Sequence, residues 1–374
     1  MTTRPPAEIG MPLEAVDTPA LLLNLDAFEK NLARMATDAA GVGIRLRPHA
    51  KSHKCPAIAL RQMAAGAVGV CCQKVSEAEA MIYGGVPDVL VSNEIVGSSK
   101  IARLVALSRQ ARVAVCADDA ANVAALNQAA AAFGARLPVL IEINVGSNRC
   151  GVEPGEPALA LAQQIATSSG LRFGGLQAYY GTAQHMREYA KRKEAIETAG
   201  EKIRSTVRLL RQHGLSCEVV SGAGTGTYEF EGSSGVWNEL QPGSYIFMDA
   251  DYLKNLKSDG TPGSQFEPSL FVYATVMSRP TKDRALLDAG LKALSIDAGL
   301  PWVVGMQDVE YARASDEHGR LALNDAGRTL RLGSKVRLIP GHCDPTVNLY
   351  DWYVCYRNGR VEALWPITAR GAVL

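Results

Sequence analysis

The sequence predicts an α/β fold, with a (β/α)8 barrel over residues 21–250 and a mainly-β domain formed by residues 1–20 and 251–374. The chain has 374 residues, which is above the usual size of a single domain. Between Leu21 and Met248, short apolar runs alternate with Ala-rich stretches of helical character. After Tyr252 the pattern changes to strand-like pieces separated by turns. These observations favour one large α/β domain joined to a smaller β domain.

The first domain contains a series of segments that are expected to be strands, because each is short, apolar and bounded by turn or helix signals. They cover residues 20–25, 43–47, 67–72, 88–91, 113–116, 138–145, 173–178, 218–221 and 244–248. Amphipathic segments between them, at 25–39, 75–82, 120–133 and 156–169, predict helices. So many β-then-α units suit a closed barrel better than an open sheet, which is usually smaller.

The second domain contains strand-like pieces at residues 270–279, 284–290, 330–340 and 352–367. Residues 254–265, between the two patterns, are polar and rich in Gly, Pro and Ser. We therefore expect an exposed connection there.

Charge and composition exclude several classes of protein. Lys plus Arg number 39 against 38 Asp plus Glu, and no basic run occurs, so we expect no nucleic-acid partner. There is no apolar stretch of membrane-spanning length, and the start MTTRPPAEIG lacks the features of a signal or transit peptide. We expect a cytoplasmic protein without a membrane segment. The eight cysteines show no framework spacing, so reduced thiols are expected.

The strongest local signal is the run RLRPHAKSHK, which starts at Arg45 and places Lys51 where a short strand ends and a helix begins. Strand ends at the carboxyl face of such a barrel are where catalytic groups collect. A lysine there can act as a nucleophile if burial and nearby cations lower its pKa, and Arg45, Arg47, His49 and His53 are candidate cations. The alternative is a solvated basic turn.

The motif RPHxKxHK, preceded by DTPAxxxxLDxxxxN from Asp17 to Asn31, resembles the alanine-racemase-like superfamily of fold-type III pyridoxal 5'-phosphate (PLP) enzymes. Within it, the chain looks closest to the branch of D-threonine aldolases, D-serine dehydratases and 3-hydroxy-D-aspartate aldolases. The resemblance runs through nearly the whole chain. It implies that Lys51 holds PLP as a Schiff base.

The same resemblance assigns residues around the cofactor. Gln73, in a segment that also matches at Glu77, would border the cofactor, with a surface glutamine as the alternative. Arg149 would approach the PLP ring hydroxyl, where its fixed fork of donors can polarise that oxygen. Tyr179 would lie against the cofactor and His185 near the substrate β-hydroxyl. Taken alone, each of these residues could equally serve packing or a surface salt bridge.

The phosphate group needs backbone N–H donors, and the segment from Val220 to Thr227 is rich in small residues that could supply them. Gly224 and Thr225 are the candidates there. By resemblance, Gly243 and the amide of Ser244 would also bind phosphate. Gln241 occupies the place where alanine racemases carry an arginine facing the pyridine nitrogen, and this departure puts a racemase function in doubt.

A metal site is implied by the run PGHCDP, with His342 and Asp344 as ligands, together with residues 315–319. Dehydratases of the branch carry H-x-C, whereas this chain reads H-C-D, so a carboxylate replaces a thiolate. Such a pair suits Mg²⁺ or Mn²⁺, and a Zn²⁺ site that uses Cys343 is the competing interpretation.

These features together imply a PLP- and metal-dependent aldolase that acts on a small β-hydroxy-D-amino acid. The best guess is cleavage of 3-hydroxy-D-aspartate to glycine and glyoxylate, with His185 removing the hydroxyl proton and the metal as Lewis acid. The partner of a side-chain carboxylate could be Arg45, Arg47 or Arg187. Alternatives are a D-threonine aldolase, a D-serine or 3-hydroxyaspartate dehydratase, a racemase and a non-catalytic PLP carrier. The resemblance also implies a homodimer.

Overall fold

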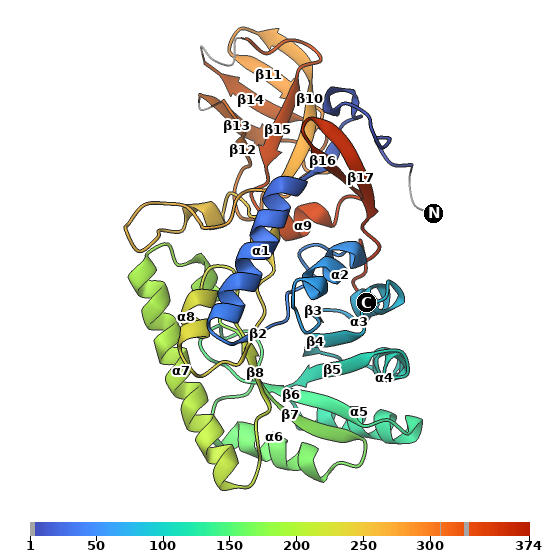
Figure 1. The fold of residues 1–374 in the computed structure, drawn as a ribbon, viewed down its shortest axis with the longest axis vertical. Coiled ribbons are helices and arrows are strands. Elements are labelled where there is room, and N and C mark those ends of the chain that lie inside the picture. Colours follow the sequence, from blue (N-terminus) through green and yellow to red (C-terminus); the bar gives the residue numbers. More distant parts are fainter. Residues whose placement is uncertain (1–3, 307, 325–328) are drawn as a thin grey trace.

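The computed structural model describes residues 4–306, 308–324 and 329–374. Figure 1 shows two parts, a barrel of parallel strands surrounded by helices and, above it, a domain of mainly antiparallel strands. The predicted fold class is therefore confirmed. No helix in the described ranges combines the length and the apolar character that a bilayer crossing requires.

Eight parallel strands form the barrel, and their order in space follows their order in the chain. They are β2 (Arg45–Leu46), β3 (Val70–Cys72), β4 (Asp88–Glu94), β5 (Arg112–Ala117), β6 (Leu137–Glu142), β7 (Leu171–Ala178), β8 (Val219–Gly222) and β9 (Glu239–Leu240). The sheet closes because β2 pairs with β9 on one side and its continuation contacts β3 on the other. Ala50 N–H donates to the Cys71 carbonyl at 2.7 Å, and Cys71 N–H donates to the Pro48 carbonyl at 2.9 Å.

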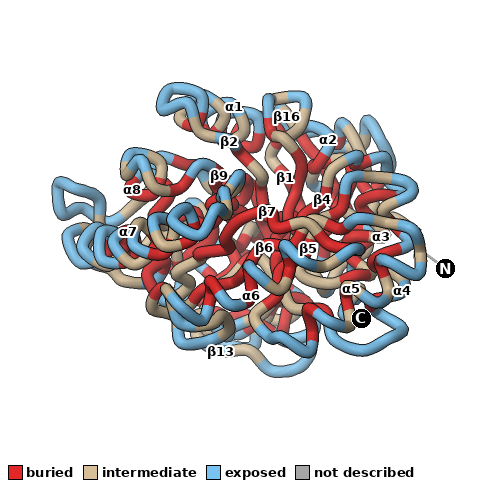
Figure 2. Tube along the Cα trace, turned by 90° about the horizontal axis from the view of Figure 1, so that it is seen from below, coloured by how far each residue is buried: buried red, intermediate tan, exposed pale blue. Residues whose placement is uncertain are grey.

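A helix follows each of the first seven barrel strands, and α1 (Leu25–Gly41), which precedes β2, completes the ring. The others are α2 (Pro56–Ala64), α3 (Val75–Tyr83), α4 (Ser98–Leu107), α5 (Ala120–Phe133), α6 (Glu156–Thr167), α7 (Tyr189–Gln212) and α8 (Tyr228–Ser233). Local sequence sets their ends. At α5, the Asp119 side chain accepts the Asn122 N–H, and Gly134 ends the helix with φ of 72°. Figure 2 shows the strands buried at the centre and the helices exposed outside.

The β domain is a nine-stranded sheet with the main order β13-β14-β11-β10-β1-β16-β17, and β15 joins β10 to β12. Its strands are β1 (Ala20–Asn24), β10 (Leu270–Thr281), β11 (Arg284–Leu287), β12 (Trp302–Val303), β13 (Val309–Ala314), β14 (Gly319–Leu323), β15 (Lys335–Ile339), β16 (Trp352–Arg357) and β17 (Arg360–Pro366). Its helix α9 spans Cys343–Val347. Short 3₁₀ turns are η1 (Leu13–Ala15), η2 (Thr182–His185), η3 (Ser244–Ile246) and η4 (Tyr252–Lys254).

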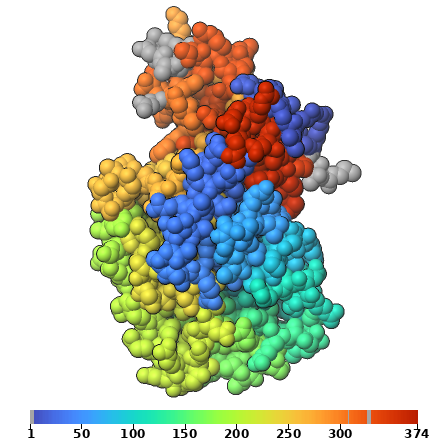
Figure 3. All heavy atoms as spheres, in the orientation of Figure 1, coloured from blue at the N-terminus to red at the C-terminus, as the bar shows by residue number. Residues whose placement is uncertain are grey.

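The segment expected to be the first barrel strand forms, but it belongs to the other sheet. Strand β1 pairs antiparallel with β10 and parallel with β16. Leu21 and Leu23 face one hydrophobic core, and Leu22 faces another on the opposite side. A central strand buried on both faces gives a continuous apolar run, and this pattern does not indicate which sheet the strand joins. Figure 3 shows the N-terminal segment beside the C-terminal strands.

The expected strand at 244–248 is wrong, because residues Ser244–Ile246 form the 3₁₀ turn η3. Tyr245, Ile246 and Phe247 are all fully buried, and so short an apolar run cannot be distinguished from a buried turn by periodicity. Residues 254–265 are largely exposed, as expected for a connection. The eight cysteines are free, also as expected.

Candidate active site

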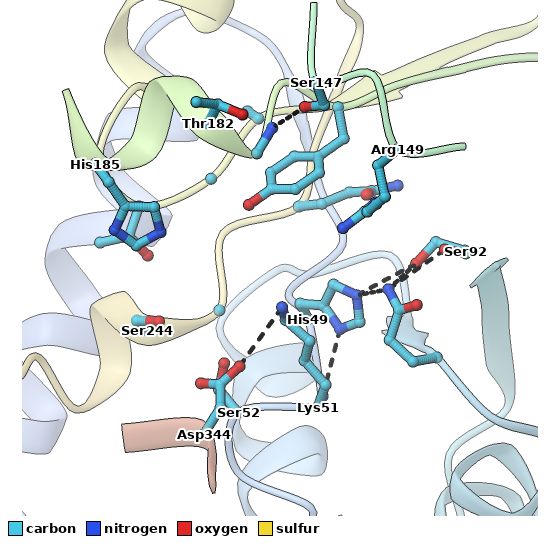
Figure 4. Close-up of a pocket in the computed structure, with 18 of the residues that line it drawn as sticks. His49, Lys51, Ser52, Ser92, Ser147, Arg149, Thr182, His185, Ser244 and Asp344 are labelled. Atoms are coloured by element: carbon cyan, nitrogen blue, oxygen red, sulfur yellow. Dashed lines mark hydrogen bonds and ion pairs between the residues drawn. The ribbon is translucent and has the colours of Figure 1, made fainter. Parts of the chain in front are cut away.

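A cavity of about 460 Å³ lies at the carboxyl ends of the barrel strands, where the barrel meets the β domain. The loops after β2, β3, β6, β7, β8 and β9 line it together with Ser92 in β4, and the start of α9 closes it from the β domain. Figure 4 shows how these side chains converge. The residues that we assigned to the cofactor, to catalysis and to the His342/Asp344 pair all line this cavity: Lys51, Gln73, Arg149, Tyr179, His185, Gly224, Thr225, Gln241, Gly243, Ser244, His342 and Asp344.

Lys51 projects into the cavity from the loop after β2 and meets a carboxylate of the other domain. Its Nζ lies 3.6 Å from Asp344 Oδ2, and 39% of its side chain is exposed. Burial opposes the charged form, but Asp344 outweighs it and raises the pKa of Lys51. The condition that we set for a nucleophilic lysine, a pKa lowered by burial and neighbouring cations, is therefore not met in this structure.

The arginines expected near Lys51 point elsewhere. Arg45 donates to the carbonyl oxygens of Glu218 and Asn238, and Arg47 is paired with Asp88 at 2.6 Å and Glu239 at 3.1 Å. Both residues precede the turn that carries Lys51, and neither lines the cavity. They are therefore not placed to bind a substrate carboxylate.

The second lysine of the motif has a structural role. Lys54 is buried, and its Nζ donates to Glu77 Oε1 at 2.5 Å. The other oxygen of Glu77 accepts the backbone N–H groups of Gln73 and Lys74 at the start of α3. The fold thus separates Lys51, which faces the cavity, from Lys54, which fastens the loop after β2 to the loop after β3.

A neutral histidine supports the Lys51 loop. Burial and then the Lys51 charge hold the pKa of His49 well below its usual range. Its Nδ1 accepts the Lys51 N–H at 3.3 Å, so the ring proton resides on Nε2. That nitrogen lies 3.3 Å from Ser92 Oγ and 2.8 Å from the amide end of Gln73. A protonated Nε2 requires an acceptor, and Ser92 Oγ can serve because its own hydrogen is directed at the Cys72 carbonyl.

The loops after β8 and β9 form a cradle of small residues. The backbone N–H groups of Gly224, Thr225 and Gly243 make no hydrogen bond to any described residue. A Cβ at Gly243 would lie 2.5 Å from Ser52 Oγ, and one at Gly224 would lie 2.4 Å from Gln184. Ser52 Oγ is buried without a partner among the described residues. Free amides and an unpartnered hydroxyl around an open space suit the phosphate of PLP.

Gln241 lies at the floor of the cavity in a reciprocal amide pair with Gln177. Its Nε2 donates to Gln177 Oε1 at 2.8 Å and to Ser221 Oγ at 2.7 Å, and its Oε1 accepts from Gln177 at 3.0 Å. Both glutamines are buried. The cavity therefore has a neutral side chain, Gln241, at the position where alanine racemases carry an arginine.

Arg149 lies on the opposite side of the cavity from His185 (Figure 4). Its guanidinium carbon is 5.7 Å from the centre of the Tyr179 ring, within cation–π range. Its Nη2 is 3.7 Å from Glu142 Oε1 at the end of β6. Burial, and then the neighbouring Glu94, raise the pKa of Glu142 to about 8. The arginine is thus held between an aromatic ring and a carboxyl group that resists ionisation.

His185 enters the cavity from η2 and is held by a carboxylate behind it. Its Nδ1 lies 2.6 Å from Asp251 Oδ2, and the other Asp251 oxygen pairs with Arg187. Although burial alone would raise it, hydrogen bonds from Arg187 and His185 keep the pKa of Asp251 below its usual range. Arg187 also donates to the Asp251 carbonyl and to Asn255 Oδ1. With its donors engaged, and outside the cavity lining, Arg187 is not placed as a substrate carboxylate partner.

A buried arginine fixes the loop that carries His185. The Arg192 guanidinium, on α7, donates to the carbonyl oxygens of Met186, Arg187, Gly226 and Leu256 at 2.6 to 3.1 Å. It therefore connects the loop after β7, the loop after β8 and the segment after η4. Burial lowers the pKa of Arg192 from its ordinary value.

The start of α9 places His342, the residue before the helix, and Asp344, in its first turn, in the cavity, and Cys343 outside it. His342 Nδ1 lies 2.8 Å from Asp297 Oδ2, which leaves Nε2 for a ligand. Cys343 is fully buried in the β-domain core, its N–H donates to Asp249, and burial raises its pKa well above the usual range. Two ligands, one imidazole and one carboxylate, with room for water or substrate suit Mg²⁺ or Mn²⁺ better than a thiolate site.

Residues 315–319, which we grouped with the metal motif, lie apart from the cavity. Residues 315–318 form an exposed turn between β13 and β14, in which the His318 carbonyl accepts the Ser315 N–H, and the buried Gly319 begins β14. Residues 315–319 are therefore not part of the cavity that contains His342 and Asp344. In the described ranges, the one cluster with three groups spaced for a common metal ion is Glu94, Glu142 and Cys150.

Several lining residues were missed by the sequence analysis. Gln177 is in β7, two positions before Tyr179, which directly follows the strand, so strand alternation alone predicts that both side chains face the cavity. Ser92 near the end of β4 could have been found in the same way. Ser147, which accepts the Gly181 N–H at 2.8 Å, and Tyr252, whose ring lies 5.8 Å from that of His185, carry no such signal.

Comparison with known proteins accounts for both domains. Residues 23–251 match the alanine racemase N-terminal domain family, and residues 269–356 match the serine dehydratase domain. The chain is 48% identical to a D-threonine aldolase of Arthrobacter sp., covering 98% of this chain and 96% of the relative. It is 46% identical to a 3-hydroxy-D-aspartate aldolase of Paracoccus denitrificans (strain Pd 1222), covering 98% and 95%. The solved D-threonine aldolase of Filomicrobium marinum is 52% identical, with a TM-score of 0.96 over 99% of this chain and 100% of that one.

Proposed function

The chain belongs to the alanine-racemase-like family of fold-type III PLP enzymes, and from this we propose that it is an aldolase that cleaves β-hydroxy-D-amino acids. The observation that carries the proposal is the meeting of Lys51 from the barrel with Asp344 from the β domain inside one cavity. A non-catalytic PLP carrier has no need of the second domain that supplies Asp344 and His342.

The residues present fit PLP and a divalent cation. Lys51 would hold PLP, the free amides of Gly224, Thr225 and Gly243 would bind its phosphate, and Arg149 would face its ring oxygen. PLP, when bound, supplies an electron sink for the pair left on Cα when a bond to it breaks. His342 and Asp344 would hold the cation, which supplies a Lewis acid for the substrate hydroxyl.

His185 is the group that we propose to take the proton of the β-hydroxyl, at Nε2. Loss of that proton accompanies breakage of the Cα–Cβ bond, so that the β-carbon leaves as an aldehyde and Cα takes up a proton to give glycine. Asp344 is the ion-pair partner of Lys51 in this structure. A cation bound to Asp344 would compete for this carboxylate and leave the Lys51 amine freer to react.

We propose 3-hydroxy-D-aspartate as the first substrate and D-threonine as the second. The cavity is lined by cationic groups of Lys51 and Arg149 and by the imidazoles of His185 and His342, which suits a substrate with two carboxylates. None of the three arginines first considered for the side-chain carboxylate lies in the lining, so these groups and the cation are the remaining partners within the described residues.

The test is to supply purified protein with PLP, Mg²⁺ or Mn²⁺ and, in turn, D-3-hydroxyaspartate, D-threonine and D-serine, and to identify the products. Glycine with glyoxylate or acetaldehyde supports the proposal. Ammonia with oxaloacetate or pyruvate would mean a dehydratase and would overturn it. Lys51→Ala should abolish cleavage and the visible absorbance of bound PLP, whereas Lys257→Ala, in the exposed connection, should change neither.

A homodimer and a cytoplasmic location are also proposed, on family resemblance alone. Sedimentation at several concentrations would test the first, with a single species of monomer mass as the contrary result. Fractionation of cells that produce the protein would test the second.

A further inference from the structure

The feature that the proposed reaction does not yet explain is Asp251, a buried carboxylate just outside the cavity. It contacts His185 on one side and Arg187 on the other, and it is 5% exposed. We propose that Asp251 is a positioning residue that fixes which ring nitrogen of His185 accepts the substrate proton. This inference rests on the aldolase function proposed above and adds a residue to its machinery.

The two oxygens of Asp251 have different partners. Oδ2 lies 2.6 Å from His185 Nδ1, and Oδ1 pairs with Arg187 Nη2. Arg187 cannot move away, because its Nη1 also donates to the Asp251 carbonyl at 2.7 Å and to Asn255 Oδ1 at 2.8 Å. The carboxylate is therefore clamped in one orientation, with Oδ2 directed at the histidine.

This arrangement determines the tautomer of the neutral imidazole. An ionised carboxylate only accepts hydrogen bonds, so the nitrogen that contacts it must carry the ring proton. With Nδ1–H directed at Asp251, the lone pair lies on Nε2. His185 lines the cavity, and the Tyr252 ring lies 5.8 Å away on its flank, so Nε2 is the atom left to accept the β-hydroxyl proton.

Two neighbouring side chains hold the backbone on both sides of His185 in place. Asn255 Nδ2 donates to the Gln184 carbonyl at 2.9 Å, one residue before His185. Arg192 holds the carbonyls of Met186 and Arg187, directly after it. Both tethers act on the backbone, so they leave the choice of tautomer to Asp251.

The structure allows a substitution that reverses the tautomer rather than removing the contact. In Asp251→Asn, Arg187 has only donors, so the amide oxygen must remain with it. The amide NH₂ then faces His185 and donates to Nδ1, which forces the ring proton onto Nε2. We expect kcat to fall at least about 100-fold, since the base is in the wrong tautomer, with KM changed less than about threefold.

Removing Arg187 as well should partly restore activity. In the double variant Asp251→Asn with Arg187→Met, the amide is free to turn and present its oxygen to Nδ1. We expect kcat at least about tenfold above that of Asp251→Asn alone. Asp259→Asn, which exchanges an exposed aspartate in the 254–265 connection, is the matched control and should leave kcat unchanged.

A direct readout is available without substrate or cofactor. In protein labelled with ¹⁵N-histidine at alkaline pH, nitrogen shifts report which ring nitrogen is protonated, and His185→Gln identifies the signal among six histidines. We expect Nδ1–H in the wild type and Nε2–H in Asp251→Asn. An Nε2–H signal from His185 in the wild type would overturn the inference even if both Asp251 variants failed to fold. So would an Asp251→Asn protein with wild-type kcat. If the wild type cleaves no substrate, the proposed function fails, while the NMR result still decides the role of Asp251.

Discussion

Replacing Glu142 with Gln should make the protein more resistant to alkaline pH. Glu142 ends β6 with 5% of its surface exposed, beside Glu94 and 3.7 Å from Arg149. Burial, and then Glu94, raise the pKa of its carboxyl group from 4.5 to about 8. The folded chain therefore holds a proton at Glu142 at pH values where the unfolded chain has released it.

The size and sign of the effect follow from this shift. Below pH 4.5 the Glu142 carboxyl group is protonated in both the folded and the unfolded chain, so the pKa difference does not change the free energy of unfolding. Above pH 8 both have lost this proton, and the folded state carries the full penalty, so stability falls as pH rises between these values. A rise from 4.5 to about 8 corresponds to about 5 kcal/mol as an upper limit. Glutamine keeps the shape and loses the charge, so the variant should be about 2–5 kcal/mol more stable than the wild type at pH 9.

The assay is thermal unfolding of the cofactor-free protein at pH 5 and pH 9. At roughly 2 °C per kcal/mol for a large chain, Tm of the variant should exceed that of the wild type by about 4–10 °C at pH 9 and by much less at pH 5. Glu231→Gln is a companion, because burial also raises the pKa of Glu231 to about 8. Glu194→Gln, exposed on α7, is the control. If Glu142→Gln kept the pH dependence of the wild type, the buried carboxyl would not be its source.

Three further experiments test other parts of the site. Asp344→Asn should weaken Mn²⁺ binding at least about tenfold by isothermal titration calorimetry, whereas Cys343→Ser should leave it within about threefold, and the reverse order would move the site to the thiol. Gly243→Ala should lower PLP affinity by about 1–3 kcal/mol in an absorbance titration, because the new methyl group would meet Ser52 Oγ at 2.5 Å; unchanged affinity would remove Gly243 from the cradle. Arg192→Met should cost about 3–5 kcal/mol in urea unfolding, since it orphans buried carbonyls, and a loss below about 1 kcal/mol would contradict that role.

The sequence was most informative where residue types and order carry the signal. The alternation of apolar runs and amphipathic segments predicted the barrel, because periodicity reflects which faces are buried. Lys51, His185 and Asp344 were found because each lies in a motif that resembles a family, and the structure places all three in one cavity. Composition alone would have left Lys51 in a solvated basic turn.

What the sequence could not supply were contacts between distant segments. The partner of His185 is Asp251, 66 positions later, and no local pattern connects them. The pKa of Lys51 is raised by Asp344, which comes from the other domain. Several residues near Lys51 in the sequence can carry a positive charge, and they would have suggested a lowered pKa. The membership of β1 in the second sheet is likewise a long-range pairing, invisible to a pattern that reports only burial.

The place of β1 has a consequence for how the chain is made. Its two neighbours in the sheet, β10 and β16, begin at residues 270 and 352, whereas the barrel strands are complete by residue 240. During synthesis from the N-terminus, the barrel can close while residues 20–24 still have both edges open and three consecutive leucines without a core. The ribosome must add some 250 residues before the first pairing is available and over 300 before the second. A nascent or truncated chain that stops between these points therefore presents an apolar strand to its neighbours, and this stage is where aggregation should concentrate.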